Sequence, residues 1–264
     1  MRAGEVVSCL KINLADGQVA EIASMSGVDC LWTDREHLAQ DWSVLNAQVW
    51  ASKIYDVDMM VRVPRGSYSD YIKPLEMDAT GIMVPHIMSV EDAKQVIHTT
   101  RFHPLGLRPI DGGSADGAYT QRDFAEYLRE ANEQRFIVLQ IEDVEPLKEL
   151  DAIASLPGFD VLFFGPGDFS QSIGAPGNWN HPELIEARKL VAKAAMKHGK
   201  FAATSAPIDS LDELIDIGYT FINVGADVAG LVKYCNGLFQ KFNDIVASKS
   251  NGAKAPGPLP GKPY

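Results

Sequence analysis

Short apolar runs alternate with amphipathic stretches along most of this chain. The apolar runs, which predict strands, lie at 7–13, 29–34, 58–64, 81–87, 136–142, 161–165, 201–205 and 221–224. The amphipathic stretches, which predict helices, lie at 19–25, 42–54, 69–76, 89–98, 145–155, 182–197 and 211–217, with a last one that ends at about 247. The pattern is therefore one of eight strands, each followed by a helix.

This pattern is typical of a closed parallel barrel. The runs LWTD, VLFFG and FINVG are almost continuously apolar, which strands buried on both faces require. An open, doubly wound sheet is the structural alternative, but it usually carries G-x-G-x-x-G after its first strand, and residues 10–17 hold no such motif. We therefore expect an α/β protein with a single (β/α)8 TIM barrel, which suits a length of 264 residues.

Two segments fall outside the alternation. Residues 103–120 form a long Gly-rich loop, followed by a predicted helix over 122–132. Loops of this length are often lids or interaction loops. Residues 248–264 form a tail rich in Pro, Gly and Lys, which we expect to fray or to lie along a neighbouring subunit. The expected organisation is one barrel over 1–247, including the last helix, and a tail over 248–264.

Composition narrows the class of protein. The apolar fraction is 46% and the charged fraction 22%, which excludes a disordered or fibrous chain. A net charge of −11 argues against nucleic-acid binding, but a small anionic substrate remains compatible. No apolar run is long enough to span a membrane, and the first residues lack the apolar core of a secretory signal. Three scattered cysteines favour a reducing cytoplasm over a disulfide framework.

Chemistry in such a barrel lies at the carboxyl ends of the strands. Polar residues at those ends of the second, third, fifth and sixth strands are Asp34, His37, Arg62, Gln140, Glu142 and Asp168. Each has an ordinary interpretation: Asp168 as a helix N-cap, Arg62 as an ion-pair residue, His37 as a capping histidine. Gln140 and Glu142 alternate along one strand and so point the same way. If they face the barrel axis, Glu142 needs a partner or a metal ion.

The combination says more than any single member. Two carboxylates on adjacent strands are a common way to hold Mg²⁺ or Mn²⁺, with water and substrate oxygens completing the octahedron. A guanidinium nearby can stabilise a developing oxyanion, and a histidine can act as a base. Such a set suits enolate chemistry next to a carbonyl group.

Five sequence blocks resemble the HpcH/HpaI family of class II aldolases, over about residues 4 to 247. The blocks, in chain order, are DREH, VRVP, the VP at 84–85, QIE and GPGDFSQSIG. The resemblance implies a (β/α)8 barrel that cleaves 4-hydroxy-2-oxo acids into pyruvate, or a related 2-oxo acid, and an aldehyde. It also implies a divalent metal ion (Mg²⁺, Mn²⁺ or Co²⁺) and a homo-oligomer, usually a hexamer, in which the last helix is exchanged between subunits.

The resemblance assigns binding roles to four residues. Glu142 and Asp168 match the metal ligands of the family, and Gln140 matches a residue that helps to hold the pyruvate moiety. Gly167 matches a position whose backbone N–H contacts the substrate carboxylate, although relatives usually carry Ala or Asn there. The segment 105–118 also departs from the family pattern, so the aldehyde end of the site is expected to differ.

The catalytic roles follow in the same way. Arg62 matches the arginine that stabilises the enolate oxygen, and His37 matches the histidine that acts as acid and base through water. Asp34 is expected to orient His37. Glu76 stands in the place of an Asp that raises the basicity of the histidine in relatives, and we expect it to do the same. In the implied mechanism, His37 removes the proton of the 4-hydroxyl group, the C3–C4 bond breaks, and the metal and Arg62 hold the enolate.

Three alternative functions remain. A CoA-ester lyase of the citrate lyase β-subunit type would share the fold and metal site, but no basic cluster is available for the CoA phosphates. A Schiff-base aldolase would need a lysine at a strand end, and Lys11 and Lys73 are the nearest. A non-catalytic metabolite-binding protein would not need the base.

Overall fold

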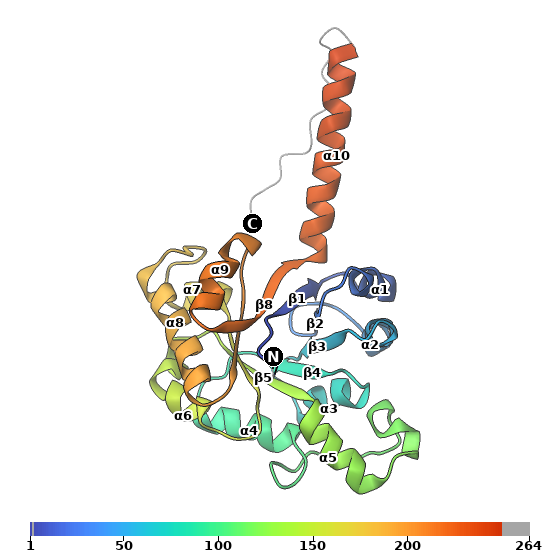
Figure 1. Cartoon of the computed structure of the whole chain (residues 1–264), viewed down its shortest axis with the longest axis vertical. Helices are drawn as coiled ribbons and strands as arrows, with labels where there is room; N and C mark the ends of the chain where they lie inside the picture. The colour runs from blue at the N-terminus through green and yellow to red at the C-terminus, as the bar shows by residue number, and fades with distance from the viewer. Residues whose placement is uncertain (2, 250–264) are drawn as a thin grey trace.

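Eight parallel strands close into a barrel, in chain order, in the computed structural model of the protein (Figure 1), which describes Met1 and residues 3–249. The strands are β1 (Val7–Ile12), β2 (Cys30–Asp34), β3 (Asp58–Arg62), β4 (Gly81–Val84), β5 (Phe136–Ile141), β6 (Val161–Phe164), β7 (Phe201–Ser205) and β8 (Tyr219–Ala226). The helices are α1 (Gly17–Met25), α2 (Trp42–Ile54), α3 (Tyr68–Glu76), α4 (Val90–Thr100), α5 (Phe124–Gln134), α6 (Leu150–Ala154), α7 (Pro166–Ser172), α8 (Pro182–Lys197), α9 (Leu211–Asp216) and α10 (Asp227–Lys249). The expected (β/α)8 barrel is confirmed.

Alternation along each strand divides the core into two parts. In β6, Val161 and Phe163 belong to the cluster inside the barrel, whereas Leu162 and Phe164 belong to the cluster between the strands and the surrounding helices. Both parts are apolar because parallel strands are covered on both faces. The inner cluster fills the barrel, so polar side chains can gather only at its rims.

Several element boundaries differ from the sequence prediction. The stretch 145–155 is a 3-10 helix, Glu145–Glu149, that continues into α6. The loop at 103–120 ends in a 3-10 helix, Ala115–Thr120, which contains left-handed residues. The short helix α7 was not expected, because its seven residues, PGDFSQS, carry no clear apolar periodicity. These differences lie in short elements, where tertiary contacts outweigh local propensity.

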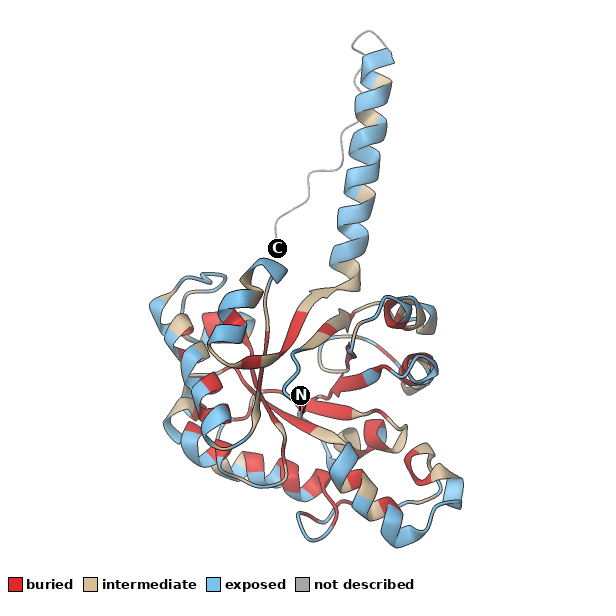
Figure 2. Ribbon diagram, viewed as in Figure 1, coloured by how far each residue is buried: buried red, intermediate tan, exposed pale blue. Residues whose placement is uncertain are grey.

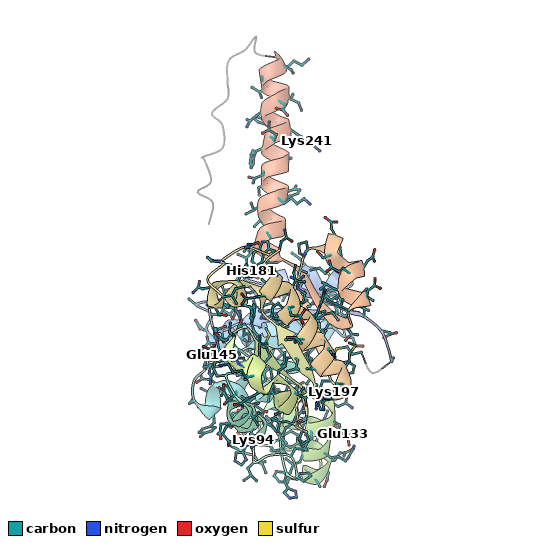
Figure 3. The ribbon with its side chains drawn as sticks, turned by 90° about the vertical axis from the view of Figure 1, so that its left-hand side faces the viewer. Lys94, Glu133, Glu145, His181, Lys197 and Lys241 are labelled. Carbon is teal, nitrogen blue, oxygen red and sulfur yellow. The ribbon has the colours of Figure 1, made fainter. Side chains whose placement is uncertain are left out.

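The last helix stands away from the barrel. Figure 2 shows α10 exposed along its length, and none of its described residues is buried. Figure 3, turned by 90°, shows its side chains, Lys241 among them, with no other described element alongside. Its start is tied to the barrel by Asp227, whose carboxylate accepts hydrogen bonds from the backbone N–H groups of Asn13 and Leu14 at 2.8 and 2.9 Å.

The helix α10 continues to Lys249, two residues beyond the expected end of the barrel domain at 247. The rest of the expected tail, 250–264, lies outside the described residues. Among the described helices, none combines the length and apolar character needed to cross a membrane.

Candidate active site

A cavity of about 700 Å³ opens at the rim where the strands reach their carboxyl ends. We call it the mouth cavity, and its walls include Trp32, Arg62, Gln140, Glu142, Asp168 and Asn223. These residues come from β2, β3, β5, β8 and the segments that follow β5 and β6, because parallel strands end at one rim. The position is the one at which barrels of this type carry their chemistry.

Arg62 is fixed by carboxylates and by an aromatic ring. Its Nε donates to Asp34 Oδ1 at 3.0 Å, a terminal nitrogen contacts the other oxygen, and Nε lies 3.1 Å from Glu36 Oε2. The guanidinium carbon lies 5.0 Å from the centre of the Trp32 ring. Asp34 and Arg62 are register partners on β2 and β3, which places the pair side by side. Arg62 is therefore a positively charged group held rigidly in the cavity wall.

Asp34 is fully buried and forms ion pairs with two basic side chains. Besides Arg62, Lys11 Nζ lies 2.9 Å from its Oδ2. Burial alone would raise the pKa of this carboxyl, but the hydrogen bond and charge of Arg62 and the charge of Lys11 lower it to about 2. Asp34 is consequently ionised at any pH at which the protein would work.

Gln140 and Glu142 face the same cavity, as their alternation on β5 predicted. The amide nitrogen of Gln140 donates to Glu142 Oε2, while the amide oxygen of Gln140 is buried and has no hydrogen-bond partner among the described residues. Gly165, directly after β6, makes room for both: a Cβ there would lie 2.5 Å from Glu142 Oε2 and 2.9 Å from the Gln140 amide nitrogen. An unpaired acceptor facing a cavity indicates that a ligand completes its hydrogen bonding.

Glu142 lies next to Asp168 and His86. One carboxylate oxygen of each acid and one ring nitrogen of His86 lie within 4.8 Å of one another. Burial and the charge of Asp168 raise the pKa of Glu142 to about 7, although the backbone N–H of His86 and the charges of His86 and Arg62 favour its ionised form. A buried carboxylate beside a second one is costly without a cation, so the pair fits a divalent metal ion.

His86 lies within the run 81–87 that predicts the fourth strand, and the sequence assigned it no role. Its backbone N–H donates to Glu142 Oε1 at 3.0 Å, and its Nδ1 lies 2.9 Å from Asp143 Oδ2. Burial lowers the pKa of His86, but the hydrogen bond to Asp143 and the charges of Glu142, Asp143 and Glu36 outweigh burial and raise it. The available signal was the adjacency of β4 and β5, which brings the residues after both strands together.

His37 lies at the rim, but without the expected neighbours. Its side chain is 58% exposed, and its Nε2 lies 3.6 Å from Glu36 Oε2. The expectation that Asp34 orients His37 needs correction, because the Asp34 side chain is engaged by Arg62, Lys11 and the backbone N–H of Glu36. Asp34 therefore positions Arg62 instead.

Glu76 is not brought to His37 within this chain. It is the last residue of α3, which runs back to the amino ends of the strands, whereas His37 follows the carboxyl end of β2. The charges that act on Glu76 are those of Lys73, Arg108, Asp111 and Asp116, and burial raises its pKa. The expected pairing of Glu76 with His37 is thus not made by a single copy of the chain.

Gly167 lies in the wall of the mouth cavity, next to Asp168. A Cβ at this glycine would meet nothing within 4 Å, so its backbone is open to a bound molecule.

Fold and site together define a barrel enzyme with a polar, acid-rich centre at the carboxyl ends of its strands. Residues 8–233 match the family model described as HpcH/HpaI aldolase/citrate lyase, and the chain belongs to this family. The expected resemblance and the assignment to the aldolase class of lyases are thereby confirmed.

Relatives named as aldolases support this family assignment. The chain is 32% identical to a hydroxypyruvate/pyruvate aldolase of Pseudomonas aeruginosa, over 97% of this chain and 93% of the relative. It is also 32% identical to a 4-hydroxy-2-oxovalerate aldolase of Rhodococcus jostii, over 89% and 91%. The structure of an HpcH/HpaI aldolase from Desulfitobacterium hafniense superposes with a TM-score of 0.86 at 26% identity, over 92% of this chain and 94% of that one.

Proposed function

We propose that this protein catalyses the reversible retro-aldol cleavage of 4-hydroxy-2-oxo acids to pyruvate, or a related 2-oxo acid, and an aldehyde. The observation that carries the proposal is the convergence of Glu142, Asp168 and Arg62 on one cavity. Two carboxylates suit a divalent cation, and a fixed guanidinium suits an enolate. The names of the two relatives, which are aldolases of oxo acids, support the same reaction class.

Glu142 and Asp168 are the proposed ligands of a divalent ion, Mg²⁺, Mn²⁺ or Co²⁺. When bound, such an ion would polarise the keto and carboxylate groups of the substrate as a Lewis acid. Gln140 would donate to or accept from the pyruvate moiety, since its amide lies beside Glu142 and its oxygen is unpaired. The backbone N–H of Gly167, which also lines the cavity, would contact the substrate carboxylate.

The proton transfer and the stabilisation of the enolate are assigned to side chains at the carboxyl ends of the strands. His37, through a water molecule, takes the proton of the 4-hydroxyl group, and the C3–C4 bond then breaks. Negative charge develops on the enolate oxygen, where Arg62 is held in place for it by Asp34 and Glu36. The C4 fragment leaves as the aldehyde, and the proton taken by His37 returns through water to C3, which completes pyruvate. Stabilisation of developing charge by a fixed donor is commonly the largest contribution to such a rate.

The alternative through a Schiff base receives no support from the cavity. None of the described residues that line the mouth cavity is a lysine. Lys11 is in an ion pair with Asp34, and Lys73, on α3, lies 5.3 Å from the centre of the Trp42 ring of α2. An amine held as a protonated partner is a poor nucleophile.

We further propose that the protein is a homo-oligomer, with α10 exchanged between copies, as in the family hexamers. The helix α10 stands away from the barrel and exposes large apolar side chains, which supports an interface with another copy of the chain. We also propose a cytoplasmic location, since Cys9, Cys30 and Cys235 are free. Its partners would be small 2-oxo acids and aldehydes.

A panel assay tests the reaction. The protein, stripped of metal and then given Mg²⁺, Mn²⁺ or Co²⁺, is offered 4-hydroxy-2-oxo acids of different chain length, and pyruvate release is measured. We expect cleavage that requires added metal and survives borohydride treatment with pyruvate. Inactivation by borohydride would favour the Schiff-base alternative, and no cleavage of any member would contradict the proposed reaction.

A further inference from the structure

We propose that Arg188 binds an anionic group on the aldehyde part of the substrate, so that the protein prefers substrates with a second negative charge. The inference deepens the proposed aldolase function and rests on it. One charge is the carboxylate of the 2-oxo acid, at the end of the mouth cavity that Glu142 and Asp168 line. The other is a carboxylate or a phosphate beyond C4, and Arg188 is the residue that selects it.

The mouth cavity extends beyond the residues assigned to the 2-oxo acid. Its walls also include residues of α8, of α9 and of the segments just before these helices: Trp179, Asn180, Arg188, Ser210 and Glu213. Its volume of about 700 Å³ is typical of cavities that enclose a whole small molecule. A 4-hydroxy-2-oxo acid bound at Glu142 and Asp168 therefore has room for the atoms beyond C4.

Arg188 is a half-buried cation without a carboxylate partner among the described residues. Its guanidinium group forms no ion pair or hydrogen bond in this part of the chain, and its Nε is buried without a partner. Most other arginines of the described chain are ion-paired, namely Arg62, Arg65, Arg101, Arg108, Arg122, Arg129 and Arg135. A partly buried charge is costly without a counter-charge, so an unpaired guanidinium in a cavity wall favours an anionic ligand.

The other charges along the cavity wall leave this role to Arg188. The only other basic residue among the described lining residues is Arg62, whose guanidinium is paired with two carboxylates. The acidic lining residues are Glu142 and Asp168, which are the proposed metal ligands, and Glu213, which is exposed on α9 and makes no ion pair with Arg188. An anion in this part of the cavity would therefore meet one cation that has no other partner.

The backbone of Arg188 is fixed by the packing of its helix. Ala187 and Val191, one position before and three after it, are buried on α8, and the Tyr219 hydroxyl donates to the Arg188 carbonyl oxygen at 2.8 Å. Only the side chain must therefore be ordered when a ligand binds, which lowers the entropic cost of binding. A guanidinium group offers several N–H donors in one plane, which suits the oxygens of a carboxylate or a phosphate.

The test is the aldol addition of pyruvate to two pairs of aldehydes by the full chain with Mn²⁺. 4-Oxobutanoate is compared with butanal, and glyceraldehyde 3-phosphate with glyceraldehyde, so that each pair differs mainly in the anionic group. We expect the parent to have a higher kcat/KM for the anionic member of at least one pair. The pair that shows the preference distinguishes a carboxylate from a phosphate.

Variants of α8 assign the preference to one residue. Arg188→Gln should reduce the ratio of kcat/KM between the anionic and the neutral aldehyde about 10–100-fold, mainly through KM, because a hydrogen bond to a charged group is lost. Arg188→Lys should retain part of the preference, since it keeps the charge but not the planar donors. Lys189→Gln removes the same charge from the exposed neighbouring position and is the matched control, which should keep the preference.

The outcomes separate this inference from the proposed function. Equal kcat/KM for both members of each pair in the parent, or an undiminished preference in Arg188→Gln, would overturn the inference and leave the proposed reaction in place. A lower particle mass of Arg188→Gln in light scattering would also overturn it, because Arg188 would then pair with an acid of another copy. If the metal-loaded parent does not exchange the methyl protons of pyruvate, the proposed function fails and this inference with it. If Arg188→Gln does not fold, as shown by circular dichroism, the parent and Arg188→Lys decide.

Discussion

Asp34 and Arg62 form a buried ion pair in the wall of the mouth cavity. Neither charge would be tolerated there alone, because an unpaired buried charge loses its hydration without compensation. The ion pair therefore keeps the guanidinium group of Arg62 in the cavity that Glu142 and Asp168 also line. In the proposed reaction, Asp34 would therefore have a positioning role through Arg62.

Replacement of Arg62 tests its role at the enolate. Arg62→Ala should lower kcat for cleavage by about 10²–10³, the usual effect of removing a donor aimed at an oxyanion. Arg62→Lys should recover only part of the loss, because an ammonium group keeps the charge but not the planar fork. Steady-state kinetics measure both, and Arg129→Ala, in an exposed pair on α5, is the matched control. A change confined to KM would contradict the role.

The lowered pKa of Asp34 predicts that the stability of the protein depends on pH. Its pKa is about 2 in the folded chain and about 3.9 when unfolded, so the folded state binds its proton less readily. The resulting stabilisation, roughly 2–3 kcal/mol, is complete above pH 4 and is lost as the pH falls through 2. In urea unfolding, the difference between the parent and Asp34→Asn should shrink from pH 5 to pH 2. A constant difference would mean that the carboxylate is not stabilised by its partners.

The candidate residues were predictable to different degrees. Arg62, Glu142 and Asp168 could be located from the sequence, because parallel strands must end at one rim. The partner of Asp34 could not, because the register between β2 and β3 decides which side chains meet. Glu76 illustrates a limit of motif matching. Its position in a sequence motif does not show at which end of the barrel the last residue of α3 lies. His86 was overlooked because a histidine after a strand has no role until its neighbours are known.

At the scale of elements, the turn from β6 into α7 determines the shape of the proposed metal site. Gly165 packs against Glu142 and Gln140, and α7 then begins at Pro166 and carries Asp168 in its first turn. The alternative interpretation of Asp168 as a helix N-cap does not apply, since Gly165 is the N-cap residue. Asp168 is thus left free to face the cavity.

Two glycines of this turn provide a matched pair of variants. In Gly165→Ala the new methyl group would overlap Glu142 Oε2, so Glu142 must move and metal binding should weaken at least about tenfold. In Gly167→Ala the methyl group meets no atom within 4 Å, and metal affinity should stay the same. Calorimetric titration with Mn²⁺ measures both. Equal affinity of Gly165→Ala and the parent would show that Glu142 is not held by this turn.

The sequence predicted the bounds of some elements correctly and misplaced or missed others. The bounds of α2, α8 and β7 agree with the prediction. The stretch after β5 was predicted as one helix but begins as a 3-10 helix, since the choice between these geometries depends on packing at the first turn. Helix α5 lies two residues later than predicted, because Asp123 caps it by accepting from the Glu126 N–H.

At the scale of the whole molecule, α10 is the part that a single chain does not explain. Its exposed apolar residues include Leu231, Tyr234, Leu238, Phe242 and Ile245, which recur at three-, four- and seven-residue intervals on one face. A helix of this kind needs a partner surface. The apolar pattern predicted the helix, but only the resemblance to the family, and not the pattern itself, implied that the helix would leave the barrel.

Leu238→Glu combined with Phe242→Glu tests the proposed interface. The charged side chains should be costly to bury between copies, so the particle mass in light scattering should fall towards that of one chain. Circular dichroism should stay close to that of the parent, because both side chains are exposed on α10 in the single chain. Lys233→Glu with Lys241→Glu, which adds as many acidic groups on the same helix, is the control. An unchanged mass in the apolar double variant would contradict helix exchange.

The central claim is that Glu142 and Asp168 hold the metal ion for enolate chemistry beside Arg62. Proton exchange at the methyl group of pyruvate tests this claim most directly. The rate of deuterium uptake from D₂O, followed by mass spectrometry, reports enolate formation without any aldehyde. We predict that metal-stripped protein in the presence of a chelator exchanges no faster than buffer. Exchange should return with Mn²⁺, Co²⁺ or Mg²⁺ in the parent and stay absent in Glu142→Gln. Exchange at the full rate in metal-free protein would contradict the claim.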